Sequence, residues 1–326
     1  MSLAFERSAA VDRAVAVVRA GFLARDICRS GGRGVVAAVF DRSLYVRVGD
    51  DFICIGEPAV GNGPTALIIA ARVAAFGLRQ GQCASVGSGR IAVAGVLFDL
   101  GKAETWRAPP WPTASAALAA TCATIAHRAA AESPADSLAR AAFGSDDAPL
   151  TRLARPRMAK FASAIRQAHA SSSPAKAGDP VTTAPSELRG QCLLDAPLSR
   201  GMTSQELLAR AVHNLIGLGH GLTPSGDDFL IGALAMLDAL GQTNIHAVLG
   251  RAVVAAAGRT SPLSASFLRA AAAGHVGENL HTAVAAILSG DADAAVAAAA
   301  RIGHTSGWDA LAGAVVTARN AFDYRG

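Results

Sequence analysis

HNLIGLGHGLTPSGDDFLIGALAML, residues 213–237, is the stretch around which the chain is organised. Glycines alternate through residues 217–221, and because each costs about 1 kcal/mol against alanine inside a helix, we expect the chain to turn there. Ser225 then precedes the acid Asp228 by three residues, directly before the apolar run 229–237. This is the Ser-x-x-Asp form of a capping box, and it predicts a helix that starts at Ser225.

The start of this helix is a candidate ligand site. The first backbone N–H groups of a helix lack partners and its dipole is positive there, so anions are attracted, and Gly226 would let a ligand approach closely. Asp227 and Asp228 add negative charge on the same turn. Two interpretations stay open: Asp228 caps the helix while Asp227 holds a Mg²⁺ ion or a substrate N–H, or both acids only stabilise the helix dipole.

A second copy of this helix start occurs near the end of the chain. Residues 306–314 (SGWDALAGA) repeat residues 225–233 (SGDDFLIGA) as S-G-x-D-x-L-x-G-A. In each copy a glycine follows the serine by seven residues, inside the expected helix, where it would let another backbone pack closely. We therefore expect two similar helix starts to face one pocket; the alternative is two tightly packed, capped helices with no ligand.

A third helix start has Ser261 at the N-cap and Pro262 at the first helical position. Arg259 beside it would suit an anion through its guanidinium fork, although arginine is as often an ordinary surface residue. Histidines precede both copies of the repeat, and their imidazoles would relay protons or bond to the backbone.

The three starts together supply the candidate site residues. The candidate catalytic residues are His220, Asp227 and His304, and Asp227 is also the candidate metal ligand. The candidate substrate-binding residues are Thr223, Ser225, Gly226, Arg259, Thr260, Ser261, Thr305, Ser306 and Gly307. Asp228 and Asp309 are candidate helix caps or metal ligands.

Composition indicates a soluble cytoplasmic protein of two domains. The chain has 326 residues, 51% of them hydrophobic and 17% charged, which excludes general disorder. The net charge of +5 is scattered, so we expect no nucleic-acid partner. Five separated cysteines without a C-x-x-C pair disfavour disulfides and zinc. Charges within residues 1–20 exclude a signal peptide, and no stretch suits a membrane span.

The pattern along the chain predicts an α+β protein, with an antiparallel β-rich domain followed by a mainly helical domain. Helical spacing over residues 9–27 predicts a surface helix, and a meander of about five strands follows. The glycine-rich loop 56–64 is either a turn or a ligand-lining loop. The expected strands are 35–40, 44–48, 52–55, 84–86 and 91–100. The expected domains are 1–107 and 108–326, divided at the WRAPPWP segment, with an exposed loop at 171–186.

The helix-start strings resemble the AllH-like family. They are GHGLTPSGDDFL at residues 219–230, TSPLS at 260–264 and GHTSGWD at 303–309, and the first is far more specific than a loose glycine pattern. The resemblance covers most of the chain and is strongest over residues 207–316. It implies a subunit of oxamate carbamoyltransferase, which acts with two partner subunits to interconvert oxalurate and phosphate with oxamate and carbamoyl phosphate in allantoin breakdown. It brings no residue assignments.

Carbamoyl transfer fits the helix starts, because negative charge develops on the carbamoyl oxygen and on the phosphoryl group. In our hypothesis the N–H groups near Ser225 and Ser306 hold these oxyanions. A competing hypothesis is a non-catalytic anion-binding or scaffolding subunit. A third is the carboxylase label that the family has also carried, for which the chain lacks a biotin, bicarbonate or metal signature.

Overall fold

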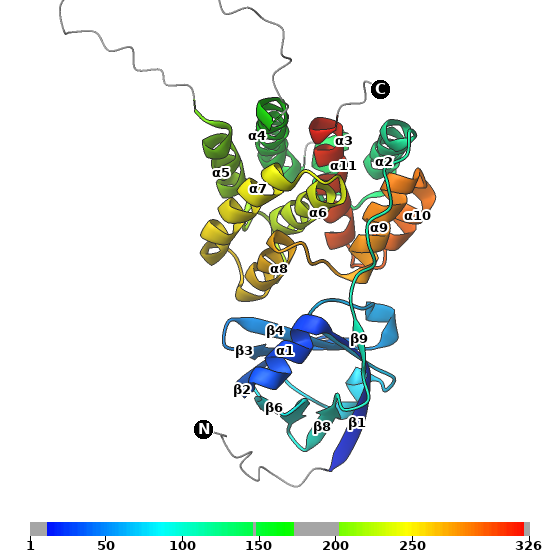
Figure 1. Cartoon of the computed structure of the whole chain (residues 1–326), viewed down its shortest axis with the longest axis vertical. Coiled ribbons are helices and arrows are strands. Elements are labelled where there is room, and N and C mark those ends of the chain that lie inside the picture. The colour runs from blue at the N-terminus through cyan, green and yellow to red at the C-terminus, as the bar shows by residue number, and fades with distance from the viewer. Residues whose placement is uncertain (1–11, 146–147, 173–201, 323–326) are drawn as a thin grey trace, which may run out of the picture.

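The computed structural model describes residues 12–145, 148–172 and 202–322. The expected loop at 171–186 falls almost entirely outside these ranges. The described chain consists of a β-rich domain followed by a helical domain, so the predicted α+β class is confirmed. Figure 1 shows the closed sheet below and the layer of helices above it.

The β-rich domain is a mixed sheet that closes on itself. Its described strands follow the order β5-β4-β3-β2-β6-β7-β8-β1, β5 also pairs with β1, and β9 lies beside β1. The predicted hairpins are present, since β2, β3 and β4 pair antiparallel, as do β6, β7 and β8. Three pairings, β1–β8, β1–β9 and β4–β5, are parallel. The strands are β1 (Arg13–Gly21), β2 (Gly32–Val39), β3 (Ser43–Val48), β4 (Asp51–Gly56), β5 (Ala66–Ile69), β6 (Cys83–Gly87), β7 (Arg90–Val93), β8 (Val96–Asp99) and β9 (Glu104–Trp106).

The helix predicted over residues 9–27 is wrong. Residues 13–21 form strand β1, and helix α1 (Phe22–Ser30) begins only after it. Val15 and Val17 alternate into the sheet's core, while both edges of β1 find partner strands in β5 and β8. The spacing of the valines in this segment fits both a helix and a strand, and pairing with distant strands makes the segment a strand. The estimate of five strands is low because β1, β5 and β9 were not expected, and because the strand expected over residues 91–100 is divided into β7 and β8 by a turn at Ala94 and Gly95.

Close packing at the junction of β1 and α1 positions a loop that matters for the site. A Cβ added at Gly21 would lie 2.1 Å from the carbonyl oxygen of Gly63, so only glycine fits there. The N–H of Ala24 in α1 donates to the carbonyl oxygen of Pro64 at 3.1 Å. The glycine-rich loop before β5 is thereby held at the end of the closed sheet that faces the helical domain.

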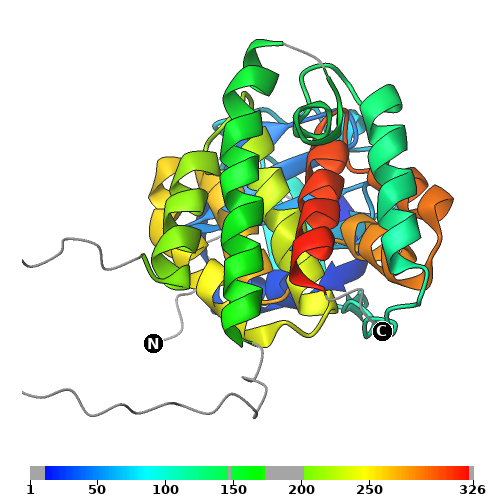
Figure 2. The ribbon, with the colours of Figure 1, turned by 90° about the horizontal axis from the view of Figure 1, so that it is seen from above.

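The helical domain packs its helices around α6. That helix is buried on almost every side, as expected for a helix that is apolar all round, and Figure 2 shows it between α4 and α11. The described helices are α2 (Leu118–Glu132), α3 (Leu138–Phe143), α4 (Pro149–Ser172), α5 (Ser204–Leu215), α6 (Ser225–Ala239), α7 (Thr243–Ala256), α8 (Pro262–Ala272), α9 (Glu278–Ser289), α10 (Ala292–Ala299) and α11 (Ser306–Ala321). Within the ranges that the structure describes, no helix is long and apolar enough to cross a bilayer.

The segment between β9 and α2 is fixed against the helical domain. The Trp111 ring stacks on His281 with 4.0 Å between ring centroids, and its Nε1 donates to an oxygen of Asp238 at 2.7 Å. Nε2 of His281 also lies 2.9 Å from the carbonyl oxygen of Pro109. Side-chain contacts therefore hold this connection in one path along the helices.

Candidate functional site

Helices α6 and α11 pack closely against each other through a reciprocal glycine contact near the middle of each helix. A Cβ added at Gly232 would lie 1.8 Å from the carbonyl oxygen of Ala310, and one at Gly313 would lie 1.9 Å from that of Phe229. These are the glycines that follow the repeated serines by seven residues. Their predicted use, close approach of a second backbone, is what the structure shows.

The first turns of the two helices exchange hydrogen bonds. The Ser225 hydroxyl bonds to the carboxyl of Asp309, and the Ser306 hydroxyl bonds to the carboxyl of Asp228. Oγ1 of Thr223 lies 3.3 Å from Oγ of Ser306, so the two helix starts are neighbours. Helix α6 starts at Ser225 as predicted, but the predicted capping box does not form, because its acid accepts from the opposite helix.

The interpretation of Gly226 and Gly307 as ligand-contacting residues is not supported. An added Cβ would lie 1.9 Å from the carbonyl oxygen of Leu215 at Gly226, and 1.9 Å from that of Ala299 at Gly307. The Gly226 N–H is also taken, since it donates to the carbonyl oxygen of Leu218 at 2.8 Å. Both glycines instead let the preceding helix pack closely.

Asp227 does not fit the expected role of catalytic residue or Mg²⁺ ligand. Its side chain is fully buried and accepts from the Gly217 N–H at 2.7 Å, the Ser264 hydroxyl at 2.6 Å and the Thr260 hydroxyl. These donors tie the glycine-rich turn and the start of α8 to α6. The described residues also contain no group of three or more His, Cys, Asp or Glu side chains suited to a metal ion.

The remaining candidates are dispersed. His220, His304 and Arg259 are exposed and do not line the cavity described below. Ser261 caps α8 as predicted, accepting from the Ser264 N–H at 3.0 Å. Thr305 is the N-cap residue of α11 and makes no side-chain cap bond. Of the predicted site residues, the structure brings Thr223, Asp228 and Ser306 together at a cavity.

That cavity, of about 280 Å³, lies between the two domains. Its helical side carries Thr223, Asp228 and Ser306, and its other side is formed by strands β3 and β4 with the glycine-rich loop. A more open groove of about 700 Å³ adjoins it, and both are lined by Thr65 and His275.

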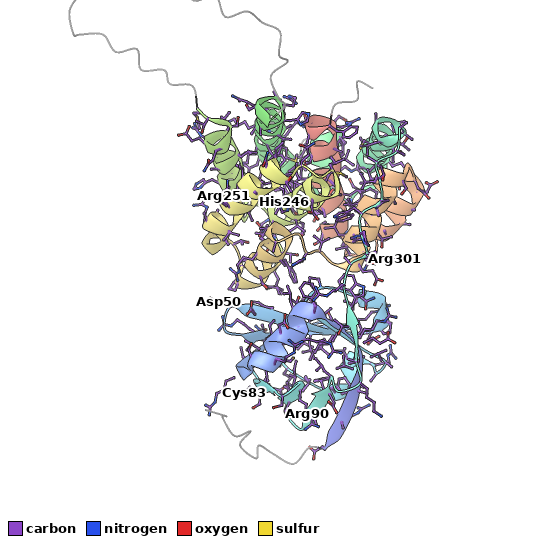
Figure 3. The ribbon with its side chains drawn as sticks, in the orientation of Figure 1. Asp50, Cys83, Arg90, His246, Arg251 and Arg301 are labelled. Carbon is purple, nitrogen blue, oxygen red and sulfur yellow. The ribbon has the colours of Figure 1, made fainter. Side chains whose placement is uncertain are left out.

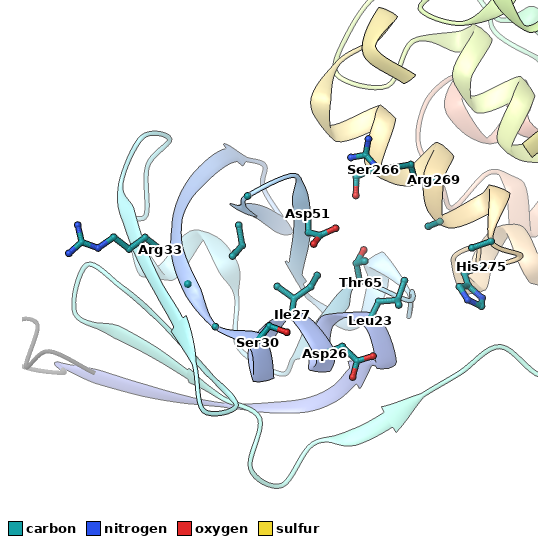
Figure 4. Close-up of a pocket in the computed structure, with 16 residues that line it drawn as sticks. Leu23, Asp26, Ile27, Ser30, Arg33, Asp51, Thr65, Ser266, Arg269 and His275 are labelled. Atoms are coloured by element: carbon teal, nitrogen blue, oxygen red, sulfur yellow. The ribbon is translucent and has the colours of Figure 1, made fainter. Parts of the chain in front are cut away.

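In Figure 4, Thr65 and Asp51 of the sheet face Ser266 and Arg269 of α8 across this groove, while Arg33 points away. Figure 3 places Asp50 at the same boundary, where its carbonyl oxygen accepts from Arg269 at 3.1 Å. The groove and the smaller cavity therefore adjoin each other at the domain junction, where they share the lining residues Thr65, Ala270 and His275.

Burial and neighbouring groups raise the pKa of two side chains that line the cavity. Burial raises the pKa of Asp228 well above its usual value, and the nearby Asp309 and Asp227 carboxyls add to the effect against the opposing bonds from Ser306 and Thr223. Oδ2 of Asp228 is buried and has no hydrogen-bond partner. On the opposite side, the Cys54 thiol holds the Tyr45 pKa well above its usual value, with burial adding to it.

Residues from the β-rich domain were missed by the sequence analysis. Tyr45 and Cys54 lie in ordinary strand patterns, and no sequence signal separates them from core residues. Asn62 could have been identified from the sequence, because it lies in the Gly-Asn-Gly-Pro run for which a ligand-lining role was one of two alternatives. The structure places Asn62 in the cavity wall with its Oδ1 buried and unpartnered.

The fold and the site define an α+β protein with a small, partly buried cavity at paired helix starts, mostly apolar in its lining but with a few polar side chains. The family model described as oxamate carbamoyltransferase subunit AllH matches residues 215–318, which include both starts. The resemblance to the AllH-like family is thereby confirmed over this part of the chain. A subunit description implies a multi-subunit complex. No curated protein and no solved structure gives a match.

Proposed function

We propose that this chain is a subunit of an oxamate carbamoyltransferase-like enzyme and that the cavity at the paired helix starts holds its carbamoyl-bearing substrate. The family match supports the reaction class. The observation that carries the site is Asp228, whose buried Oδ2 has no partner and which lines the cavity. Perturbed, partly unsatisfied acids in a cavity are typical of functional sites.

The proposed chemistry is attack of hydrogen phosphate on the terminal carbamoyl carbon of oxalurate. A bond forms between that carbon and a phosphate oxygen, and the bond from carbon to the oxamate nitrogen breaks. The phosphate proton ends on that nitrogen, so the products are carbamoyl phosphate and oxamate. During attack, negative charge develops on the carbamoyl oxygen, and a donor placed there lowers the barrier.

Asp228 is the proposed donor. Burial raises the pKa of this carboxyl well above its usual value, which favours the protonated form, and in that form it can donate through Oδ2 to the carbamoyl oxygen. The hydroxyls of Thr223 and Ser306 bond to the same carboxyl and hold its orientation. Each hydroxyl belongs to one of the two helix starts, so the crossing of α6 and α11 sets the donor's position.

The test compares Asp228→Ala with Asp309→Ala in the enzyme assembled with its partner subunits. Both variants remove a buried helix-start acid, but only Asp228 lines the cavity. We expect Asp228→Ala to lower kcat by about 10²- to 10³-fold, the usual effect of losing one oxyanion donor. Asp309→Ala should lower kcat per folded molecule much less than Asp228→Ala does, because Asp309 lies outside the cavity and acts on the reaction only through the pKa of Asp228.

A more conservative variant, Asp228→Asn, separates loss of the donor from misfolding. Asp228→Asn keeps a weaker donor of nearly the same shape, and its kcat should fall between wild type and Asp228→Ala. Circular dichroism would confirm that each variant is folded. Full turnover in both Asp228 variants would refute the assignment and would favour the non-catalytic, scaffolding role.

A further inference from the structure

Asn62 is held in one orientation by a two-way link to α9. Its backbone N–H and its Nδ2 both donate to Oε2 of Glu278, at 2.9 and 2.7 Å. The Glu278 N–H in turn donates to the carbonyl oxygen of Asn62 at 2.8 Å. Because a carboxylate oxygen accepts hydrogen bonds, the amide nitrogen of Asn62 must face Glu278, which leaves Oδ1 as the free acceptor.

Two residues that each carry an unpartnered, buried polar atom therefore line the cavity from opposite domains. Asn62 and Asp228 are each 8% exposed, and Oδ1 of the first and Oδ2 of the second have no hydrogen-bond partner. Buried polar groups in native proteins are nearly always paired, so two such atoms in one cavity wall indicate a ligand. The ligand must offer an N–H donor to the Asn62 oxygen.

Charge restricts the ligand further. The described residues that line this cavity include no lysine and no arginine, and Glu278 adds a carboxylate. A free phosphate or carboxylate placed here would have, among the described lining residues, only the His275 side chain as a group able to carry positive charge. The cavity thus favours a neutral amide-type group, and it leaves the charged end of a substrate to lie toward the open groove.

We propose that Asn62 and Asp228 together recognise the terminal carbamoyl group of a ureido compound, with its N–H on Asn62 Oδ1 and its carbonyl oxygen on Asp228 Oδ2. This inference rests on the proposed function and adds to it the ligand class and a specificity residue from the β-rich domain. One partner comes from each domain, so the bound group joins them. Glu278 acts as a positioning residue because it fixes the orientation of the Asn62 amide.

The test is calorimetric binding to the full chain, with four probes at the same millimolar concentrations. Oxalurate and the neutral N-acetylurea share the ureido group, whereas oxalate and inorganic phosphate are anions without it. We expect the two ureido compounds to bind with affinities within about tenfold of each other, and the two anions not to bind. A tenfold difference in affinity corresponds to about the contribution of one hydrogen bond to binding.

Variants then locate the contact. Asn62→Ala should weaken N-acetylurea binding by about tenfold. Glu278→Gln should also weaken it, because the glutamine N–H can donate to Oδ1 and turn the Asn62 amide around. Asn320→Ala, near the far end of α11, is the control and should bind like wild type.

Several results would overturn the inference. They are oxalate or phosphate binding as tightly as oxalurate, no binding of either ureido probe, and unchanged N-acetylurea affinity in Asn62→Ala. The proposed function can fail separately from this inference. If the chain bound N-acetylurea but the assembled enzyme did not turn over oxalurate, the carbamoyltransferase proposal would be refuted and the proposed recognition of a ureido group would stand. If Asn62→Ala turned over oxalurate and bound N-acetylurea as tightly as wild type, only the proposed recognition of the ureido group by Asn62 would be refuted.

Discussion

Substitution of Gly232 by alanine should disrupt the helix crossing that forms the site. The added Cβ would lie 1.8 Å from the Ala310 carbonyl oxygen, and α11 would have to recede by roughly 1.6 Å to reach ordinary contact at 3.4 Å. Overpacking of this kind costs about 1–3 kcal/mol or more, whereas alanine's better helix propensity returns about 1 kcal/mol. Because a rigid backbone atom opposes the methyl, we expect a net loss of about 2 kcal/mol or more.

Two other glycines provide matched controls for this prediction. Gly250 in α7 has its nearest neighbours at 3.3 Å, and Gly258 has none within 4 Å. Unfolding by urea, followed by circular dichroism, should therefore rank Gly232→Ala as the least stable, Gly250→Ala as mildly affected and Gly258→Ala as close to wild type. The close crossing would be refuted if Gly232→Ala were as stable as Gly258→Ala.

Further predictions concern the buried acids, the connecting segment and the cysteines. Burial raises the pKa of Asp309 from 3.8 to about 7, so the folded chain binds this proton more tightly and stability falls as pH rises from about 4 to 7. The free energy of unfolding of Asp309→Asn should fall less over that range, in urea titrations at each pH. Asp227→Asn should lose about 2–4 kcal/mol in the same assay, because three donors lose their charged acceptor. Trp111→Phe should cost about 1 kcal/mol by leaving the partly buried carboxyl of Asp238 without this donor, and limited proteolysis should cut the connecting segment faster. Among the described cysteines, exposed Cys83 should react first with iodoacetamide at pH 8, while Cys54, buried with its pKa raised to about 12, should stay unmodified in mass-mapped peptides.

The helical domain could be predicted from local signals. Serine and proline positions marked the starts of α6, α8 and α11, because helix starts depend on a few neighbouring residues, although the predicted side-chain cap forms only at α8. The repeat around Ser225 and Ser306 also predicted that two similar helix starts would lie together. The close approach at Gly232 was predictable because a glycine inside a helix, away from either cap, most often allows another backbone to pack closely.

The β-rich domain was less predictable because its closure depends on distant pairings. Strand β1 pairs with β8 and β5, which are far along the chain, so residues 13–21 gave an ambiguous local pattern. The roles of individual site residues depend on packing for a similar reason. The sequence made Asp227 the candidate catalytic residue and Asp228 a candidate cap, whereas the structure gives Asp227 three hydrogen-bond donors and leaves Oδ2 of Asp228 without a partner.

A crystal structure of the full chain with oxalurate would test the central claim most directly. The account predicts oxalurate in the cavity between the domains, with its terminal nitrogen within hydrogen-bond distance of Asn62 Oδ1 and its terminal carbonyl oxygen at Asp228 Oδ2. Oxalurate held anywhere else, for example by exposed arginines, with the cavity occupied only by water, would contradict it.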